Sequence, residues 1–498
     1  MGFKSRLSTL WAPPQLNPVT KKARSIPLLN PLDRHGRVFF FSWMGFMIAF
    51  WAWYTFPPLL TVTIREDLHL TKTQVANSNI VSLSATLLIR LISGPLCDAI
   101  GPRKVFALVL LLGSIPVGLA PLIHNAAGLY TIRFFIGILG ASFVPCQVWC
   151  TLWFDRNVVG TANGLAGGWG NAGGGVTYFI MPAVFDSLVG KGLTPGKAWR
   201  VTFVVPLGGG PTATKQSKPT SPSPPLTQPT RPPTPIRSSL SQAPLPPALH
   251  PPPAHPTPTL APRKSKAPLP LPPSPRPKPC HPLPPEIPLP PSLHTAIPIL
   301  LSPQCLFHVL TYACSFGGEL AINAVLSSYY LSLFPTKLTQ TTASNYAAIF
   351  GFLNFLTRPL GGVIADLLYN LAPARYKLWS KKLWITTCGV LTGSLLILIG
   401  LYKSPSLAVT IALVCVMAFF HEAGNGANFA LLPHVFPQAN GLLSGVTGAG
   451  GNLGGVVFAI VLRFMDGGTN YSKGFWVIGI VHVVVNLAVC WVRPVAES

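Results

Sequence analysis

The sequence predicts an all-α membrane protein with twelve transmembrane helices in two six-helix halves, and three observations carry this prediction. Only 10% of the 498 residues are charged, whereas 49% are hydrophobic and the mean hydropathy is +0.46; soluble domains carry about 25% charged residues. The apolar residues gather in runs of roughly 20, the length that crosses the hydrocarbon core of a bilayer. Two motifs recur once in each half of the chain. Such long runs predict helices, because membrane strands are about ten residues long and alternate in polarity.

Eleven apolar runs are long enough to span a membrane. A twelfth begins at Trp199 and breaks after about ten apolar residues into Gly, Pro, Ser and Thr, too few to cross. The sixth span is therefore predicted to be truncated. The eleven runs cover residues 38–62, 79–97, 105–123, 129–153, 162–185, 305–334, 344–369, 383–402, 406–432, 440–464 and 474–492.

Charge placement orients the helices. With the N-terminus in the cytoplasm, 24 of the 36 Lys and Arg fall in cytoplasmic segments, 9 in outer loops and 3 within spans. This asymmetry follows the positive-inside rule. We therefore expect both termini in the cytoplasm, and attribute the net charge of +24 to topology rather than to nucleic-acid binding.

The middle of the chain has a composition of its own. Residues 211–300 contain 32 of the 55 prolines, and a segment of this kind cannot bury a core. We predict a disordered, Pro-rich cytoplasmic tract between the two helical halves. The predicted organisation is a cytoplasmic tail (1–37), an N-terminal half (38–210), the tract (211–304), a C-terminal half (305–492) and a second cytoplasmic tail (493–498).

Two motifs repeat in corresponding places, which is typical of transporters built from repeats. The pattern R-x3-G-x3-D starts at Arg90 in span two and again at Arg358 in span eight. A glycine-rich run surrounds Asn171 in span five, and a second surrounds Asn452 in span eleven. For each asparagine, ligand contact and an interhelical hydrogen bond remain equally open.

Arg90 and Arg358 are predicted to bind an anion. Each lies near the middle of its span, where an arginine costs roughly 2.5–3.5 kcal/mol to insert. A structural salt bridge is the alternative, but Asp98 and Asp366 lie two turns away, about 12 Å along the helix. Two unpaired guanidinium groups facing one cavity would repel each other unless an oxyanion lay between them.

Acidic residues inside the spans are candidates for proton coupling. Glu319 shares a helical face with Tyr312 and Phe316, at spacings of seven and three residues. His421 and Glu422 in span ten show a similar pattern. For Glu319 the alternative is a structural carboxyl group that is hydrogen-bonded within the bundle.

A cytoplasmic latch is predicted where spans two and three join. Asp98 ends one helix, Arg103 follows in a basic turn, and Asp366 occupies the matching place in the second half. This loop resembles the signature of the major facilitator superfamily. The sequence contains no P-loop, metal-ligand spacing or catalytic elbow, so we expect no catalytic residues, enzyme activity, metal or cofactor.

The glycine-rich runs resemble the two nitrate signatures of the nitrate/nitrite porter family, and further stretches are similar to fungal high-affinity nitrate transporters. The matching stretches are Phe39–Phe46, Phe143–Cys150, Gly168–Gly175, Tyr312–Gly317, Asn425–Ala430 and Gly448–Gly455. The family departs from this chain at 207–304, where its members complete span six. Such a departure is what a translated intron or a faulty gene model would produce.

The resemblance implies import of nitrate, and also of nitrite, by proton symport and alternating access at the plasma membrane, in a multi-pass protein that we expect to be monomeric. Nitrate/nitrite antiport and a transport-inactive nitrate sensor are the alternatives. The implied partners are nitrate, nitrite, protons and the lipid bilayer. The implied binding residues are the arginines Arg90 and Arg358, the asparagines Asn171 and Asn452, and the aromatic residues Phe50, Tyr312 and Phe316.

Overall fold

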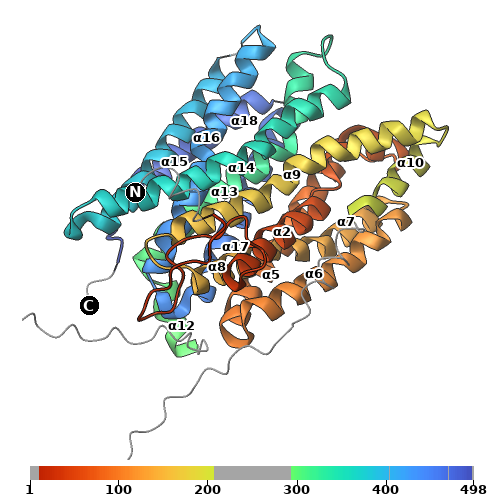
Figure 1. The fold of residues 1–498 in the computed structure, drawn as a ribbon. Coiled ribbons are helices and arrows are strands. Elements are labelled where there is room, and N and C mark those ends of the chain that lie inside the picture. Colours follow the sequence, from red (N-terminus) through yellow and green to blue (C-terminus); the bar gives the residue numbers. More distant parts are fainter. Residues whose placement is uncertain (1–9, 207–292, 403, 469, 496–498) are drawn as a thin grey trace, which may run out of the picture. The chain divides into compact units, whose positions relative to one another are not determined.

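The structure is a computed structural model that describes residues 10–206, 293–402, 404–468 and 470–495 (Figure 1). Within these residues the regular elements are all helices, joined by turns and loops, and two isolated bridges join Ala23 to Leu16 and to Phe154. Eleven of the described helical segments are long and apolar enough to cross a membrane. The prediction of an all-α membrane protein is confirmed.

The helices follow the predicted spans, with most ends a few residues further out. In the N-terminal half they are α2 (Arg34–Trp53), α5 (Lys72–Ile100), α6 (Pro102–Leu119), α7 (Ala126–Ile136), α8 (Phe143–Trp153), α9 (Val159–Gly190) and α10 (Pro195–Thr202). In the C-terminal half they are α12 (Leu293–Leu300), α13 (Pro303–Leu333), α14 (Gln340–Leu371), α15 (Lys377–Leu401), α16 (Leu407–Leu431), α17 (Asn440–Phe464) and α18 (Tyr471–Ala488).

Local sequence explains where several of these helices begin. The Asp33 carboxylate accepts hydrogen bonds from the first backbone N–H groups of α2. Thr71 and Gln74 form a reciprocal capping box at the start of α5, and Thr339 caps α14 in the same way. Gly101, with a φ of +90°, ends α5 and allows Pro102 to open α6 at once.

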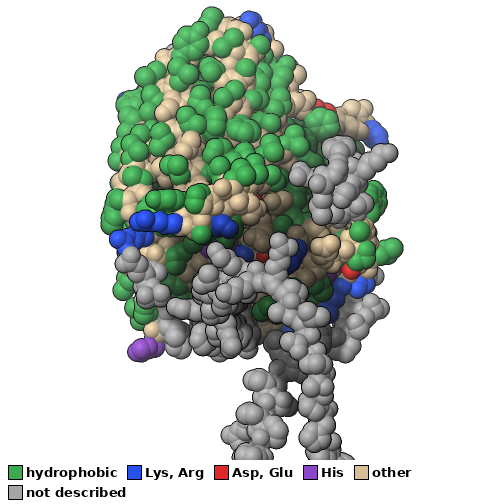
Figure 2. All heavy atoms as spheres, turned by 60° about the vertical axis from the view of Figure 1, so that its left-hand side comes forward, with side chains coloured by type: hydrophobic (Ala, Val, Ile, Leu, Met, Phe, Trp, Pro, Cys, Tyr) green, Lys and Arg blue, Asp and Glu red, His purple; other side chains and the backbone are tan. Residues whose placement is uncertain are grey.

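Lipid-facing side chains cover the outside of the bundle. Figure 2 shows hydrophobic side chains over the upper part of one face, with Lys and Arg gathered along its lower boundary. Large exposed apolar residues such as Leu111, Phe179 and Val416 belong to the long helices. An apolar band bounded by cations suits a bilayer.

The predicted sixth span is short in the described residues. Helix α10 has 8 residues and rises only about 12 Å, against the roughly 30 Å of a bilayer core. Its buried Trp199 donates a hydrogen bond to Asp67, and Arg200 pairs with the same carboxylate at 2.8 Å. The described part of the segment is thus anchored at one end of the bundle, and it is again helical over 204–206, where the described residues end.

Two predicted boundaries are wrong. The tract was predicted to run to residue 304, but α12 lies inside it and α13 begins at Pro303, because the apolar run from Leu293 supports a helix. The first tail was predicted to reach residue 37, but α2 begins at Arg34. The rest of the tract, and the explanation offered for it, lie outside the described residues.

The two halves meet through helices whose backbones approach closely. Helix α9 packs on α14, and α5 packs on α17 (Figure 1). A Cβ atom at Gly94 would lie 2.6 Å from the carbonyl oxygen of Gly441, and one at Gly362 would lie 2.2 Å from that of Gly160. Glycine at these crossings is therefore required for contact between the halves.

Candidate functional site

The site is built around Arg90 of α5 and Arg358 of α14, one from each half. Both side chains are buried, at 0% and 1% exposure. The guanidinium carbon of Arg90 lies 5.1 Å from the ring centroid of Phe143 and 4.9 Å from that of Phe316. The corresponding distances for Arg358 are 5.2 and 5.8 Å. The two cations therefore converge on the same two rings.

The hydrogen bonds of the two arginines differ. Arg90 donates from Nε and Nη2 to the carbonyl oxygen of Gly140, at 2.9 and 2.8 Å, and from Nη1 to that of Gly448 at 3.0 Å. Arg358 donates from Nη2 to the Tyr312 hydroxyl at 2.9 Å, whereas its buried Nη1 has no partner among the described residues. Arg358 thus retains a free donor.

Neither arginine forms an ion pair with any residue that the structure describes. A buried cation without a counterion is costly. Two such cations on shared rings, one of them with a free N–H, can bind an oxyanion through charge-assisted hydrogen bonds.

Aromatic rings enclose this centre. Phe143 stacks with Tyr312 and Phe316, at centroid distances of 6.1 and 6.0 Å, and Tyr312 stacks with Phe316 at 5.1 Å. Phe429 meets Phe143 edge-on at 4.8 Å. The sequence pointed to Tyr312 and Phe316 but not to Phe143 or Phe429. Both of these lie in stretches that resemble the family, and that location was the one signal that could have made them candidates.

Phe50 lies outside this ring cluster in the described contacts. It packs on Phe46 at 4.5 Å, and Phe46 in turn packs on Phe143 at 5.5 Å. The residue one helical turn earlier, Phe46, is therefore the aromatic side chain of α2 that faces the cluster.

The two signature asparagines occupy different surroundings. Asn452 donates from Nδ2 to the carbonyl oxygen of Gly448, the same atom that accepts from Arg90. Asn171 donates to the Glu319 carboxylate at 3.3 Å. The Oδ1 atoms of both asparagines are buried without a partner in the described chain. Asn452 is thus close to Arg90, and Asn171 links the N-terminal half to a carboxylate.

A buried carboxylate network lies beside the arginines. Glu319 accepts from Asn354 at 2.9 Å and from Asn425 at 2.7 Å. Glu422 accepts from the same Asn354 amide at 3.0 Å and from the Thr357 hydroxyl. Sequence analysis proposed the two glutamates separately and missed Asn354, which joins them.

His421 points elsewhere. Its Nε2 meets the Ser315 carbonyl oxygen, its Nδ1 lies 3.4 Å from the Met417 sulfur, and its ring lies 5.3 Å from that of His482. It adjoins Glu422 in sequence but contacts a different part of the C-terminal half.

The glycine-rich runs shape the site. A Cβ atom at Gly167 would lie 2.9 Å from Arg358 Nε, and one at Gly451 would lie 2.8 Å from the Tyr312 ring. Side chains at these positions would displace the arginine and the aromatic residues. The glycines therefore bring α9 and α17 against the binding groups.

Asp98 and Asp366 join the halves at one end of the bundle, which we call the latch end. Asp98 of α5 accepts from the backbone N–H groups of Gly441 and Leu442, at 2.9 and 2.8 Å. Asp366 of α14 accepts from the Thr161 N–H at 2.7 Å and pairs with Lys381 at 2.9 Å. Each carboxylate thus holds the start of a helix in the opposite half.

Arg103, the third residue predicted for the latch, lies near the start of α6 and is half-buried. Both aspartate contacts cross between halves, so separation of the halves at this end would break them.

Comparison with known proteins identifies the family of this chain. Residues 42–370 match the Major Facilitator Superfamily. A protein named elsinochrome transporter 1, from Elsinoe fawcettii, is 33% identical over 99% of both chains. A high affinity nitrate transporter of Arabidopsis thaliana is 31% identical over 94% of this chain and 82% of its own length. A nitrate/nitrite transporter of Nostoc punctiforme is 28% identical over 88% and 89%.

The fold and the site define a multi-pass membrane transporter. The chain belongs to the major facilitator superfamily and, within it, to the nitrate/nitrite porter family.

Proposed function

We propose that this protein imports nitrate, and also nitrite, by proton symport, with the anion held between Arg90 and Arg358. The observation that carries the proposal is the convergence of two buried arginines, without a described counterion, on the rings of Phe143 and Phe316. A planar oxyanion accepts parallel hydrogen bonds from planar guanidinium groups. Tyr312, Asn171 and Asn452 complete the polar lining.

A relative named for elsinochrome transport makes a second cargo worth testing. The arrangement of the arginines favours the small anion. Arg90 is already held by two carbonyl oxygens, and its faces are covered by Phe143 and Phe316.

Glu319 and Glu422 are the candidates for the proton site. They share one amide donor and lie on helices of the same half. Moving a nitrate against a negative interior costs about 2.3 kcal/mol per 100 mV, and one proton only cancels that charge. We therefore propose that more than one proton accompanies each nitrate. A pair of carboxylates favours symport over nitrate/nitrite antiport.

The proposed setting is the plasma membrane, with both termini cytoplasmic and the latch end facing the cytoplasm, and with the monomer as the working unit. Alternating access would break the Asp98 and Asp366 contacts when the site opens inward. The short α10 leaves a transport-inactive sensor as the rival, which would bind nitrate without moving it.

The decisive experiment measures surface level, nitrate binding and nitrate uptake for Arg90→Ala and Arg358→Ala. We expect both variants to reach the membrane, to lose binding and to take up no nitrate; charged hydrogen bonds are worth about 1.5–3 kcal/mol each. Lysine at either place should restore little, because an ammonium is a point charge and cannot reproduce the planar guanidinium fork through which Arg90 donates to Gly140 and Gly448.

Arg133→Ala is the matched control, since Arg133 is also buried but bonds to Ser78 and Asn79. We expect its nitrate KM to be unchanged in whatever protein reaches the membrane. Normal uptake by Arg90→Ala would overturn the proposal. Binding without uptake in the parent chain would support the sensor, and elsinochrome uptake that nitrate does not inhibit would support the second cargo.

A further inference from the structure

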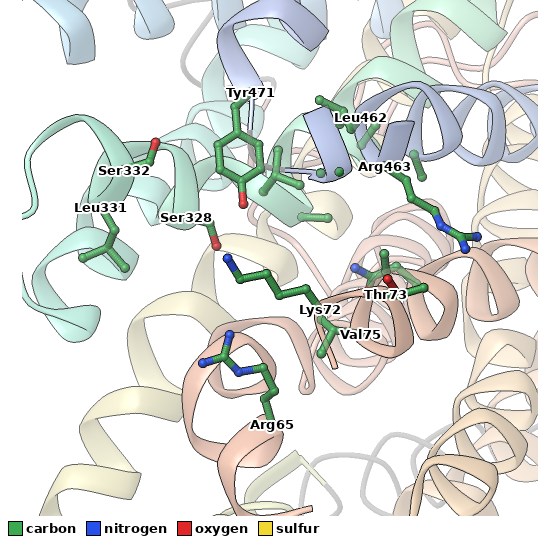
Figure 3. Close-up of a pocket in the computed structure, with 18 of the residues that line it drawn as sticks. Arg65, Lys72, Thr73, Val75, Ser328, Leu331, Ser332, Leu462, Arg463 and Tyr471 are labelled. Atoms are coloured by element: carbon green, nitrogen blue, oxygen red, sulfur yellow. The ribbon is translucent and has the colours of Figure 1, made fainter. Parts of the chain in front are cut away.

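A cavity of about 390 Å³ lies at the end of the bundle opposite the latch end. Its walls come from α5 and the preceding residues Val62 and Arg65 in the N-terminal half, and from α13, α17, α18 and the α17–α18 connection in the C-terminal half (Figure 3). The start of α5 and the ends of α13 and α17 form its rim. In the predicted orientation, this cavity opens toward the outside of the cell.

The cavity is lined by three cations, Arg65, Lys72 and Arg463, and by no acidic residue. Figure 3 shows the Lys72 ammonium extending into the space between Ser328 and Arg65. Lys72 and Arg463 form no ion pair with the described residues, and Arg65 approaches Glu66 only to 4.0 Å, with 67% of the glutamate side chain exposed. The lining therefore carries an uncompensated positive charge.

A second acidic residue beside the rim, Asp466, already has partners of its own. Asp466 precedes the lining residue Gly467 and accepts from Asn470 at 2.8 Å while lying 4.0 Å from Lys473. Ser328, Ser332 and Tyr471 add neutral hydroxyl groups to the walls, of which the Ser332 hydroxyl already donates to the Tyr329 carbonyl oxygen at 2.7 Å. The cavity thus offers donors and positive charge, which suits an anion.

The floor of the cavity is a thin apolar layer. Leu83 and Leu320 line the cavity, are 6% and 3% exposed, and both lie within 3.5 Å of a Cβ built on Gly455. Leu320 directly follows Glu319, and it lies one helical turn beyond Phe316, the ring that Arg90 contacts. These two leucines therefore connect the wall of the cationic cavity to residues that adjoin the arginine site.

We propose that Arg65, Lys72 and Arg463 form an outer anion site that collects small inorganic oxyanions from water and supplies them to the arginine pair across the Leu83–Leu320 layer. The nature of the transported anion rests on the proposed function, but the anion selectivity of the cavity does not. A cleft with low-dielectric walls focuses the field of its charges, raising local anion concentration and entry rate. Salt weakens this effect.

The first experiment measures the cavity potential without transport. Ser332 lines the cavity and is exposed, so Ser332→Cys can react with anionic and cationic methanethiosulfonate reagents of similar size. The measured quantity is the ratio of the anionic to the cationic reaction rate. Thr194→Cys, at an exposed position before α10, gives the reference ratio. We expect the ratio at Ser332→Cys to be about tenfold higher than this reference. The parent chain corrects for native thiols such as Cys490.

Lys72→Gln and Arg463→Gln should each bring that rate ratio toward the value at Thr194→Cys. Lys191→Gln is the matched control, because it removes one exposed cation at the same end, outside the cavity. An equal ratio at the two cysteines, unaffected by Lys72→Gln, would overturn the outer site even if nitrate transport is established.

The second experiment joins the cavity to transport. Lys72→Gln and Arg463→Gln should raise the KM for nitrate about threefold to tenfold at low ionic strength, leave kcat unchanged and lose most of the salt dependence of KM. Lys72→Arg should behave as the parent. An unchanged KM would overturn the supply role, and an absence of any nitrate uptake by the parent chain would instead count against the proposed function.

An anionic lipid headgroup has the same chemistry as a dissolved oxyanion. The measurements are therefore repeated in vesicles of phosphatidylcholine alone and with added phosphatidylglycerol. We expect the effect of Lys72→Gln on KM in both. An effect confined to the vesicles that contain phosphatidylglycerol would assign the cations to a lipid headgroup and overturn the proposal.

Discussion

Glu319 and Glu422 share one hydrogen-bond donor, the Asn354 amide, which lies 2.9 and 3.0 Å from their respective carboxylate oxygens. The three residues come from α13, α16 and α14, so the amide joins three helices of the C-terminal half. Asn171 adds a contact from α9 in the other half. A change of protonation at either carboxylate would therefore alter the hydrogen bonds at the interface between the halves.

Asn354→Ala should uncouple protons from nitrate. The change leaves two buried carboxylates without a shared donor, at a cost of about 1–3 kcal/mol, while the contacts of the arginines remain. We expect nitrate binding within about threefold of the parent, and at least a tenfold loss of accumulation driven by a proton gradient. Asn486→Ala is the control, because that buried amide donates to the His482 carbonyl oxygen and has no contact with either glutamate among the described hydrogen bonds. Equal losses of accumulation in both variants would contradict a specific role for Asn354.

Glu319→Gln and Glu422→Gln distinguish the two carboxylates. If both exchange protons, either variant should lose nitrate-evoked inward current while still exchanging nitrate across the membrane. Glutamine keeps the shape of the side chain, and its amide oxygen can still accept from Asn354. Full accumulation and full current in both variants would remove proton coupling from this network.

Tyr312→Phe should weaken nitrate binding about tenfold, because it removes a hydrogen bond to a charged partner and leaves Arg358 less firmly oriented. Isothermal titration of the purified protein measures this directly. Tyr330→Phe removes the hydroxyl of another buried tyrosine of α13 and serves as the control. A weaker affinity in the control and not in Tyr312→Phe would contradict the orientation of Arg358 by Tyr312.

Glycines of one motif should differ in their tolerance of alanine. At Gly454 a Cβ would lie 2.0 Å from the backbone oxygen of Ala313, whereas at Gly455 its nearest neighbours are Leu320 and Leu83 atoms at 3.4 and 3.5 Å. We expect Gly454→Ala to destabilise the protein by about 1–3 kcal/mol and Gly455→Ala to cost less. Thermal unfolding in detergent, followed by tryptophan fluorescence, compares them; an equal loss would contradict the close packing of α13 on α17.

The sequence indicated the spans, and the two arginines inside them, because both can be recognised from a short stretch of residues. A run of apolar residues reports the bilayer, and an arginine within such a run is costly wherever its helix packs. Asn354 and Phe143 could not be found this way. Neither is costly alone, and only the packing of α14 and α8 gives them their partners.

Helix ends were predicted less well for a related reason. Polar residues extend α5 back to Lys72 and α14 back to Gln340, outside the apolar runs. Capping boxes at Thr71 and Thr339 determine these starts, and hydropathy does not detect them. Phe50 and Phe46 lie one turn apart on the same face of α2, and the sequence could not show that Phe46 is the one that packs on Phe143.

The two latch aspartates should respond differently to neutralisation. Asp98 contacts two backbone N–H groups, whereas Asp366 also pairs with Lys381, which is 0% exposed. Asp98→Asn should weaken the closed latch end with little loss of stability. Asp366→Asn should also cost about 3–5 kcal/mol in stability, because it leaves a buried ammonium without its counterion.

Adding Lys381→Met to Asp366→Asn distinguishes the stability cost of an unpaired Lys381 from the role of Asp366 in closing the latch end. The double variant removes the unpaired cation, so we expect most of the lost thermal stability to return. The contact of Asp366 with the Thr161 N–H would still be weakened, because an amide carries no negative charge to hold the start of α9. Val158→Cys, at the half-buried residue before α9, leaves both Thr161 contacts with Asp366 in place. Probed from the cytoplasmic side in the otherwise unchanged chain, this cysteine gives the closed reference, and it should react faster in the double variant. Recovery of stability together with reference reactivity would mean that the Asp366 charge stabilises the C-terminal half without holding the latch end closed.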